Sequence, residues 1–495
     1  MKKDWLVKSL VAGVPVVLLE TYDAAQSMKA AILSLGEKNV NFSFLEYDRA
    51  RGLVGHELSL SGQAMARAMA PNGIADSEDY FEALRLIMRN APEKTIIFYH
   101  GAQDILGQGP HCQAIWVLRD ILKERKSMLV LMTPGAKVPE SLKYDLLVIT
   151  EPLPAEEDIA RIVQDNCDKT QFTLTPETKQ LAVARCRGIL TEFAIEQAVA
   201  LSLDKDDGLD LQALSQQRRA FVQQTDGLEI RTDSTTFADI AGYRAIKRRI
   251  LQEINSKAPP DEIVWLDELR EMVAGANSLD GTTRDQLGHW QGWLQDRLNA
   301  DTFVGIILVG FPGTCKSALA ASTRNEAQCE CLRVDFGAQK SKFVGESEQK
   351  ARIVTRTIDA IGKRILCIAT CNGLEGIPAP FLSRFTGGTY FFDLATEEER
   401  DAILALKRAK FNISDTDLEP DMTGWTGRDI HECCRNANRL GISLIEAARG
   451  LTPFCKTNRA DIDSLRKEAV AKGWLSASTG EAYVLPSIAT GRKIG

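Results

Sequence analysis

The stretch Ile306-Ile-Leu-Val-Gly310-Phe-Pro-Gly313-Thr-Cys315-Lys316-Ser317 decides the fold of the second half of this 495-residue chain. An apolar run leads into a glycine-containing turn and then into a helix, which is the layout of a buried strand, a loop and a helix. In this layout backbone N–H groups converge on phosphate oxygens, a lysine contacts the outer phosphates and a hydroxyl can bind Mg²⁺. We predict a phosphate-binding loop made by Gly310, Phe311, Pro312, Gly313, Thr314, Cys315, Lys316, Ser317 and Ala318, with Ser317 also binding the metal.

The loop departs from the pattern G-x-x-x-x-G-K-[ST] at one position, where Cys315 replaces the last glycine. A Cβ atom narrows the loop there and can demand a backbone angle that costs about 1 kcal/mol or more. The alternative to a working phosphate loop is a chance turn or a relic that no longer binds phosphate.

A second apolar strand ends in two neighbouring acids, in the stretch Ile263-Val-Trp-Leu-Asp267-Glu268. Nucleotide sites lie at the carboxyl ends of parallel strands, so these carboxylates are placed to work with the phosphate loop. We predict that Asp267 holds the shell of a magnesium ion and that Glu268 polarises the attacking water. The alternative is an acidic pair that only caps the next helix.

The order of these two strands is unusual. In the common arrangement of P-loop ATPases the acidic strand follows the phosphate loop, whereas here it comes first. The stretch 283–298 carries Leu287, Trp290, Trp293 and Leu294 on one apolar face, which predicts the helix that usually follows the acidic strand. We therefore expect that a strand–helix unit has moved, giving a rearranged strand order.

The composition is that of an ordinary folded chain. Apolar residues make up 44% and charged residues 26% of the sequence, which excludes disordered, collagen-like and membrane classes. The net charge of -7 lacks the broad basic field of non-specific nucleic-acid binding, so nucleic acid is a disfavoured partner. The 11 cysteines show no C-x-x-C and no paired metal-ligand spacing, which fits reduced thiols in a cytosol. The start shows no spanning helix and no cleavable leader, so we expect a cytoplasmic protein without a membrane partner.

Two modules of alternating strands and helices divide the chain. The expected strands lie at 14–19, 42–45, 95–99, 128–132 and 146–149, and again at 263–266, 306–309, 333–336, 365–369 and 390–392. This alternation predicts an α/β fold of two parallel-sheet modules, each followed by a small helical lid. The polar run 215–226 indicates a solvated linker and a boundary. The predicted domains are 1–225, a first module without a phosphate loop; 226–393, the large ATPase subdomain; 394–455, its helical lid; and 456–495, a C-terminal tail.

These residues resemble an AAA-type (AAA+) ATPase, in particular the phage-borne and plastid or cyanobacterial AAA proteins with a degenerate first module. The resemblance is firm over about 237–448 and rests on layout alone over 1–225. It identifies the acidic pair as a Walker B segment placed before the Walker A loop. After its opening strand the first module continues Glu20-Thr-Tyr-Asp-Ala-Ala-Gln, without a glycine or lysine for phosphate, so it is expected to be nucleotide-free.

Two segments resemble the family's contacts to nucleotide and substrate. Thr236-Phe-Ala-Asp239-Ile240-Ala241-Gly242 is similar to the adenine-contacting segment, which implies that Asp239, Ile240 and Ala241 bind the base; a helix cap is the alternative. The string 342–348 is similar to the pore loop, which implies that Lys342, Phe343 and Val344 grip a threaded polypeptide; a core plug is the alternative.

Three polar side chains resemble the family's sensors of the γ phosphate. Asn372 ends a strand similar to sensor one, which implies that its amide orients the lytic water. Arg384 lies in a segment like that of the arginine finger, a guanidinium donated to a neighbouring subunit's ATP. Arg428 lies in a turn like sensor two of the lid. A turn asparagine and a surface ion pair are the alternatives to the first two.

The resemblance implies Mg²⁺-dependent ATP binding and hydrolysis by a ring of identical subunits, hexameric in the family, that remodels a protein substrate. Two other functions stay open. One is a nucleotide-gated scaffold with little or no hydrolysis, suggested by Cys315 and the displaced acidic strand. The other is an AAA motor acting on nucleic acid, which the net charge disfavours. The expected location is the cytoplasm, that of the host if the chain is phage-encoded.

Overall fold

The computed structural model describes residues 4–37, 42–58, 64–67, 79–90, 93–136, 138–170, 172–187, 191–204, 208–223, 225–273, 281–339, 346–414 and 416–486. Its contacts divide the chain into two compact units, Met1–Arg218 and Arg219–Gly495. Each unit contains a mostly parallel sheet with flanking helices, which confirms the predicted α/β class. Within the described ranges, no helix combines the length and apolar character needed to cross a bilayer.

The first unit is built on a sheet in the order β4-β3-β2-β5-β6-β1-β7. At one edge β3 pairs antiparallel with both β2 and β4, and the other neighbours pair in parallel. The side chains of β1 alternate between two cores, with Val16 and Leu18 in one and Val17 and Leu19 in the other. A parallel strand is buried on both sides because helices cover both faces of its sheet. The strands are β1 (Val16–Glu20), β2 (Ser43–Asp48), β3 (Gly52–Leu58), β4 (Ala64–Arg67), β5 (Thr95–His100), β6 (Met128–Thr133) and β7 (Leu147–Thr150).

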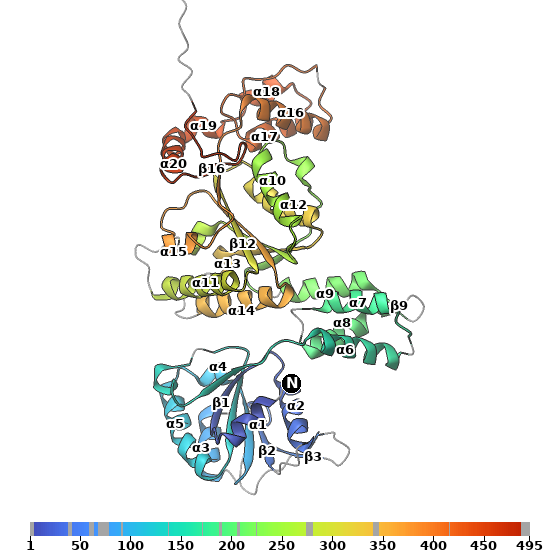
Figure 1. The fold of residues 1–495 in the computed structure, drawn as a ribbon, viewed down its shortest axis with the longest axis vertical. Coiled ribbons are helices and arrows are strands. Elements are labelled where there is room, and N and C mark those ends of the chain that lie inside the picture. The colour runs from blue at the N-terminus through green and yellow to red at the C-terminus, as the bar shows by residue number, and fades with distance from the viewer. Residues whose placement is uncertain are drawn as a thin grey trace, which may run out of the picture. The chain divides into compact units, whose positions relative to one another are not determined.

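Helices flank this sheet and then form a separate helical group (Figure 1). α1 and α2 contribute Leu6 and Ile32 to one core, and α3 and α5 contribute Leu84 and Leu118 to the other. In the helical group, α6 packs against α7 and α8. The helices are α1 (Asp4–Val11), α2 (Ala24–Glu37), α3 (Tyr80–Asn90), α4 (Ala102–Ile105), α5 (Gly109–Glu124), η1 (Glu140–Leu142), α6 (Glu156–Lys169), α7 (Pro176–Cys186) and α8 (Glu192–Leu201), with the short strands β8 (Leu203–Asp204) and β9 (Gly208–Leu209) after them.

The polar stretch that we expected to be a solvated linker is mostly helical. Residues Leu211–Gln223 form α9, and the division between the two units falls within this helix. Leu214 and Val222 are both fully buried. The linker prediction was wrong over these residues because two well-spaced apolar side chains give an otherwise polar helix a side that packs.

The second unit contains a sheet in the order β10-β13-β11-β14-β12-β15-β16. β10 and β13 pair antiparallel, and all other neighbours pair in parallel. The acidic strand β11 lies between β13 and β14, and β14 separates it from the phosphate-loop strand β12, although β11 comes first in the chain. Their carboxyl ends therefore meet at one edge of the sheet. The strands are β10 (Leu228–Arg231), β11 (Glu262–Asp267), β12 (Phe303–Gly310), β13 (Glu330–Asp335), β14 (Ile365–Cys371), β15 (Thr389–Phe392) and β16 (Leu475–Ser476).

Two pairs of helices flank the second sheet. α10 and α12 share a core with one of its faces, where Ile250 and Leu319 lie among strand residues such as Ile306. α11 and α14 pack against each other, and Trp293 Nε1 of α11 donates to Asp359 Oδ1 of α14 at 2.6 Å. The helix expected over 283–298 is α11. The helices are η2 (Phe237–Asp239), α10 (Arg244–Ile254), η3 (Leu269–Met272), α11 (Gly281–Asn299), α12 (Lys316–Ala327), α13 (Phe336–Gln339), α14 (Glu346–Ile361) and α15 (Ala379–Leu382).

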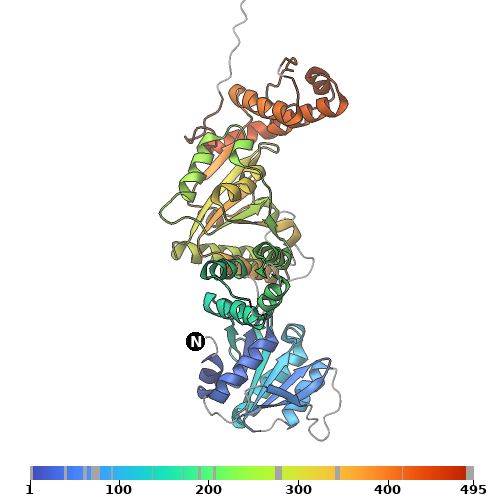
Figure 2. The same ribbon diagram turned by 90° about the vertical axis from the view of Figure 1, so that its right-hand side faces the viewer.

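A helical lid with its own core follows the second sheet. Ile403, Trp425 and Ile430 are among the buried residues of this core. Figure 2 shows the lid at the end of the unit opposite to α11 and α14. The lid contains α16 (Glu397–Phe411), α17 (Gly427–Leu440) and α18 (Leu444–Arg449).

The residues after the lid fold back onto the sheet. α19 (Phe454–Thr457) and α20 (Arg459–Ala471) lead into β16, which pairs with β15. Asp393, at the junction of sheet and lid, accepts hydrogen bonds from Tyr483 Oη at 2.6 Å and from Arg466 Nε at 2.9 Å. The C-terminal segment is therefore fastened to the hinge of the lid.

Candidate nucleotide site

The phosphate loop is shaped by two glycines in conformations that other residues rarely adopt. Gly310 has φ +156°, and a Cβ atom on it would lie 2.2 Å from the carbonyl oxygen of Phe392. Gly313 has φ +86°, and a Cβ atom on it would lie 2.8 Å from Thr426 Oγ1 in the lid. These close approaches explain why the chain has glycine at both positions.

Cys315 takes the left-handed conformation that its position in the pattern demands. Its φ is +63° and its ψ is 17°, directly before the first residue of α12. Other residues than glycine adopt this conformation at a cost of about 1 kcal/mol. A Cβ atom on Gly427 of the lid would lie 3.3 Å from the Cys315 sulfur, so the thiol occupies space next to the start of α17. Burial raises the pKa of the Cys315 thiol, so it is a neutral group in the loop.

Lys316 points its ammonium group inward. Its Nζ donates to the carbonyl oxygens of Gly310 at 2.8 Å and Phe311 at 2.9 Å, and to Asn372 Oδ1 at 3.0 Å. The side chain is 5% exposed. Burial lowers the pKa of Lys316 to about 8, and the nearby Glu268 opposes that effect. The ammonium is thus a buried cation held mainly by neutral acceptors.

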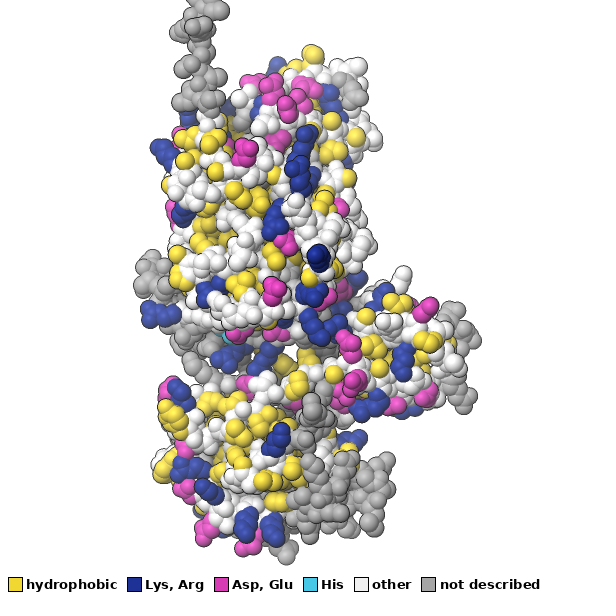
Figure 3. Space-filling view, in the orientation of Figure 1, with side chains coloured by type: hydrophobic (Ala, Val, Ile, Leu, Met, Phe, Trp, Pro, Cys, Tyr) yellow, Lys and Arg dark blue, Asp and Glu magenta, His cyan; other side chains and the backbone are white. Residues whose placement is uncertain are grey.

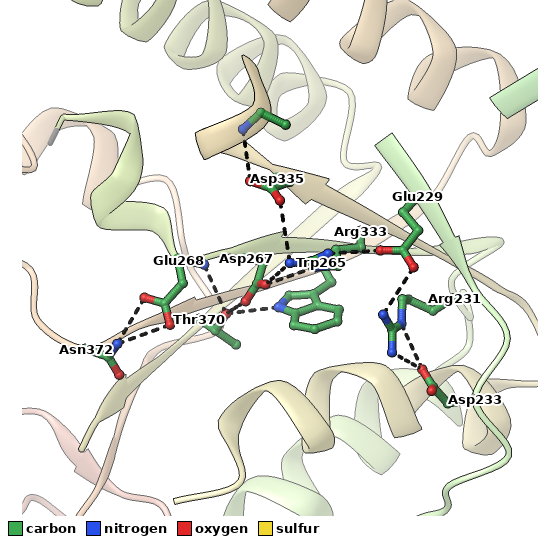
Figure 4. A network of polar contacts seen from close by, with 11 residues as sticks. Glu229, Arg231, Asp233, Trp265, Asp267, Glu268, Arg333, Asp335, Thr370 and Asn372 are labelled. Atoms are coloured by element: carbon green, nitrogen blue, oxygen red, sulfur yellow. Dashed lines mark hydrogen bonds and ion pairs between the residues drawn. The ribbon is translucent and has the colours of Figure 1, made fainter. Parts of the chain in front are cut away.

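Glu268 and Lys316 are joined through one asparagine (Figure 4). Asn372 Nδ2 donates to both carboxylate oxygens of Glu268, each at 3.1 Å, while its Oδ1 accepts from Lys316. Burial raises the pKa of Glu268, and Lys316 acts in the opposite direction. The structure therefore brings together the strand-end acid, the strand-end amide and the phosphate-loop lysine, from β11, β14 and α12.

Asp267 is directed to a different partner. Its Oδ2 accepts from Arg333 Nε at 2.9 Å and Nη2 at 2.7 Å, and its Oδ1 accepts from Thr370 Oγ1 at 2.9 Å. It does not line the cavity next to the phosphate loop, whereas Glu268 does. The metal contact expected of Asp267 stays a prediction, and this carboxylate is engaged by Arg333.

A cavity of about 460 Å³ opens between the phosphate loop and the lid. This volume lies within the range of small-molecule and cofactor sites. Backbone N–H groups at the start of α12 and the side chains of Lys316 and Arg428 fit a triphosphate, and the Ser317 hydroxyl is an oxygen donor for a metal. Among the described residues no cluster of three or more His, Cys, Asp or Glu side chains could hold a metal by itself. The lining residues are Asp239, Ile240, Ala241, Glu268, Pro312, Gly313, Thr314, Cys315, Lys316, Ser317, Ala318, Asn372, Ile403, Leu406, Lys407, Gly427, Arg428 and His431.

The lid supplies lining residues that the sequence analysis missed. Ile403, Leu406 and Lys407 lie on α16, and His431 lies on α17. The spacing of the first three is that of one face of a helix, which is a signal that could have identified them. Burial lowers the pKa of His431, with a further contribution from Lys407, so the imidazole is neutral near pH 7.

The wall formed by Asp239, Ile240 and Ala241 is fixed by polar contacts. Lys247 Nζ donates to the carbonyl oxygens of Phe237, at 2.9 Å, and Ile240. The lid meets the phosphate loop directly, because the Arg428 N–H donates to the Gly313 carbonyl oxygen at 3.1 Å. The cavity is thus bounded on one side by the start of α17 and on another by residues 239–241.

Several predicted site residues lie elsewhere. Gly310 and Phe311 shape the loop but do not line the cavity. Arg384 also does not line it, and its guanidinium donates to the Pro380 carbonyl oxygen in its own subdomain. The predicted pore-loop residues Lys342, Phe343 and Val344 lie outside the described residues.

The corresponding place in the first unit holds carboxylates. The turn between β1 and α2 carries Asp23, whose Oδ1 accepts from the Gln26 N–H at 3.1 Å and whose Oδ2 accepts from the Phe193 N–H of α8 at 3.4 Å. Gln26 Nε2 also donates to Glu192 Oε2 at 3.0 Å. The space left is about 40 Å³, with Asp23, Glu151 and Glu192 in its lining. A cavity this small and lined by carboxylates does not fit the phosphate chain of a nucleotide.

Comparisons with known proteins agree with this layout. Residues 2–151 match the family described as SpoVK-like AAA ATPase, N-terminal domain, and residues 306–368 match the ATPase family associated with various cellular activities (AAA). An uncharacterized AAA domain-containing protein ycf46 of Pyropia yezoensis is 21% identical over 374 residues, covering 67% of each chain. The ycf46 protein of Guillardia theta is 20% identical over 410 residues, covering 71% of this chain and 74% of its own. Two segments of the chain therefore match AAA ATPase domain families, and the chain is weakly similar to the ycf46 AAA proteins.

Proposed function

We propose that the second unit binds Mg·ATP in the cavity between phosphate loop and lid and hydrolyses it. The observation that carries this proposal is the Glu268–Asn372–Lys316 contact, which joins an acid to the lysine of a phosphate loop. In this proposal Glu268 polarises the attacking water, and the Asn372 amide orients that water. A bound magnesium ion would neutralise charge on the phosphates, with Ser317 as its ligand from the loop.

Binding of a triphosphate competes for the Lys316 ammonium. In the structure, Lys316 Nζ donates to three oxygen atoms of the chain itself. Phosphate oxygens are stronger acceptors than carbonyl oxygens, so Nζ turns toward them and releases Asn372 Oδ1. The Asn372 amide keeps its hydrogen bonds to Glu268. Asn372 and Glu268 together can then orient a water molecule between the Glu268 carboxylate and the phosphate.

The test compares phosphate release and nucleotide affinity in the wild type and in Glu268→Gln. Loss of a general base lowers turnover by about 100-fold or more, while nucleotide affinity stays within about threefold of wild type. Glu271→Gln is the matched control, because Glu271 is an exposed acid of the same segment that does not line the cavity. Unchanged turnover in Glu268→Gln would defeat the assignment.

We also propose that the active form is a homo-oligomeric ring, a hexamer by resemblance, that acts on a protein substrate. Arg384 does not reach the cavity of its own chain, which supports a role at the site of a neighbour. Mixing Arg384→Ala with Glu268→Gln subunits tests this role, because some interfaces then combine an intact Glu268 with an intact Arg384. Recovery of turnover above that of either variant alone is expected, and no recovery at any mixing ratio would refute a trans-acting Arg384.

A nucleotide-gated scaffold is the second candidate function. This function is favoured by Asp267, because its carboxylate pairs with Arg333 and does not line the cavity where a magnesium ion would bind. Nucleotide binding without phosphate release in the wild type would select the scaffold. A motor on nucleic acid has less support, since the face in Figure 3 intersperses basic with acidic and apolar side chains over the second unit.

A further inference from the structure

A chain of ion pairs crosses the second sheet from its edge strand to the acidic strand (Figure 4). Arg333 on β13 donates from Nη1 to Glu229 Oε2 of β10 at 2.9 Å, and from Nε and Nη2 to Asp267 Oδ2 of β11. The guanidinium also lies over the ring of Trp265, 5.4 Å from its centroid. The Arg333 guanidinium therefore donates to two carboxylates on the neighbouring strands, and its Nη2 lies 3.7 Å from a third, Asp335 Oδ2 of its own strand.

The Asp267 carboxylate extends this chain to Thr370. Thr370 Oγ1 donates to Asp267 Oδ1 at 2.9 Å and accepts from Trp265 Nε1 at 3.0 Å and from the Glu268 N–H at 3.4 Å. A hydroxyl has one proton and two acceptor positions, so these three contacts use its full capacity. Rotation of Thr370 would break all of them together.

Glu268 has a backbone conformation that needs support from its surroundings. Its φ is +47°, a left-handed conformation that carries strain for a residue with a Cβ atom. Such strain persists only where surrounding contacts hold the residue in place. Glu268 is held by its N–H bond to Thr370, by the two bonds from Asn372 to its carboxylate, and by its carbonyl oxygen, which accepts from the Glu271 N–H at 2.7 Å.

We propose that Arg333 is a positioning residue for the hydrolysis assigned to Glu268, acting through Asp267 and Thr370. The proposal rests on the proposed function. Arg333 does not line the cavity, so it contacts neither nucleotide nor water there. Its guanidinium fixes Asp267 Oδ2, Asp267 Oδ1 fixes the Thr370 hydroxyl, and that hydroxyl fixes the backbone of Glu268.

The geometry requires a guanidinium. Arg333 reaches Asp267 with two nitrogens and Glu229 with a third, while its guanidinium carbon lies over the Trp265 ring. The ammonium of a lysine is a single point charge without this fork or this plane, so it can serve Asp267 only in part. Arg333→Lys should therefore recover part of what Arg333→Gln loses.

The chain offers a matched control in Arg231. This residue also lies over Trp265, at 5.8 Å, and also pairs with Glu229, at 3.2 Å. Its other partner is Asp233 at 2.6 Å, and it makes no contact with Asp267. Arg231→Gln removes a similar charge from the same network without disturbing the contacts that lead to Glu268.

The experiment measures kcat, KM and nucleotide affinity for wild type, Arg333→Gln, Arg333→Lys and Arg231→Gln, together with amide hydrogen exchange in nucleotide-free protein. In Arg333→Gln we expect kcat to fall by about tenfold or more with nucleotide affinity within about twofold of wild type. The kcat of Arg333→Lys should lie between those of wild type and Arg333→Gln. The kcat of Arg231→Gln should stay within about twofold of wild type. The Glu268 amide should exchange faster in Arg333→Gln than in Arg231→Gln, because its acceptor is released.

Two outcomes overturn the inference while leaving the proposed function standing. One is a wild type that hydrolyses ATP together with an Arg333→Gln variant that keeps its kcat and its Glu268 amide exchange. The other is equal damage in Arg231→Gln, which would indicate general loss of the network and no path through Asp267. A wild type that binds ATP but does not hydrolyse it would instead overturn the proposed function, and this inference with it.

Discussion

Replacement of Lys316 by methionine should show how much the buried Lys316 ammonium lowers the free energy of unfolding when no nucleotide is bound. Lys316 is buried, and its pKa is lowered from 10.5 to about 8. A shift of one pKa unit corresponds to about 1.4 kcal/mol, so the charged form is disfavoured in the folded state by about 3 kcal/mol. Methionine has a similar length and no charge, and it removes this penalty.

The sign of the pH dependence follows from the two pKa values. The unfolded chain binds the Lys316 proton more tightly than the folded chain, so between pH 8 and about 10.5 the unfolded state carries more protons. Raising the pH through this window therefore increases the contribution of Lys316 to the stability of the wild type. The penalty is fully present below pH 8 and is lost as the unfolded chain also deprotonates.

The assay is denaturant unfolding of wild type and Lys316→Met at several values between pH 7 and 10.5. The free energy of unfolding of the wild type, taken relative to the variant, should rise by about 3 kcal/mol across this range. Titrating groups that do not interact with Lys316 are common to both proteins and cancel in the difference, whereas the thiols of Cys315 and Cys371 interact with it. A difference that does not change with pH would refute a buried, weakly compensated ammonium.

The same group governs nucleotide binding in the opposite direction. A lysine with a pKa of about 8 loses its charge at mildly alkaline pH in the free protein. ATP affinity should then fall about tenfold for each pH unit above 8, up to the loss seen in Lys316→Met. Equilibrium binding of a fluorescent ATP analogue measures this fall, and an affinity that is level from pH 7 to 10 would contradict it.

Three further substitutions test the loop, the first unit and the hinge. Gly310→Ala should destabilise the second unit by more than about 2 kcal/mol in thermal unfolding, because the added Cβ would lie 2.2 Å from a backbone oxygen. Asp23→Ala should cost about 1–2 kcal/mol and speed amide exchange at the start of α8, whereas Asp79→Ala, which removes the side-chain cap at the start of α3, should leave α8 unchanged. Tyr483→Phe should cost about 1–2 kcal/mol by denaturant unfolding because it removes the hydrogen bond to Asp393, and an unchanged midpoint would show that the C-terminal segment does not hold the hinge.

The parts of the site that the sequence predicts are those written in contiguous residues. The strand, turn and helix around Gly310 and Lys316 follow from local pattern, and the structure has β12 and α12 there. The acidic strand is equally local, and β11 ends at Asp267 as expected. The rule that carboxyl ends of parallel strands meet was then enough to place Glu268 near the phosphate loop.

The parts that could not be predicted depend on contacts between distant residues. Nothing in the local sequence indicates that Arg333 engages Asp267, because that pairing comes from the register of β13 against β11. The two-residue strand β16 has no periodicity of its own and exists through its pairing with β15. Leu214 and Val222 similarly became a packing side only within the folded helix α9.

The place of β11 in the sheet has a consequence for synthesis of the protein on the ribosome. The strand emerges first, but the strands on either side of it, Glu330–Asp335 and Ile365–Cys371, are made much later. At roughly 5–20 residues per second, translation leaves this apolar segment without neighbours for several seconds. During that interval the nascent chain exposes Ile263, Val264, Trp265 and Leu266, which makes β11 a segment open to non-native contacts during synthesis.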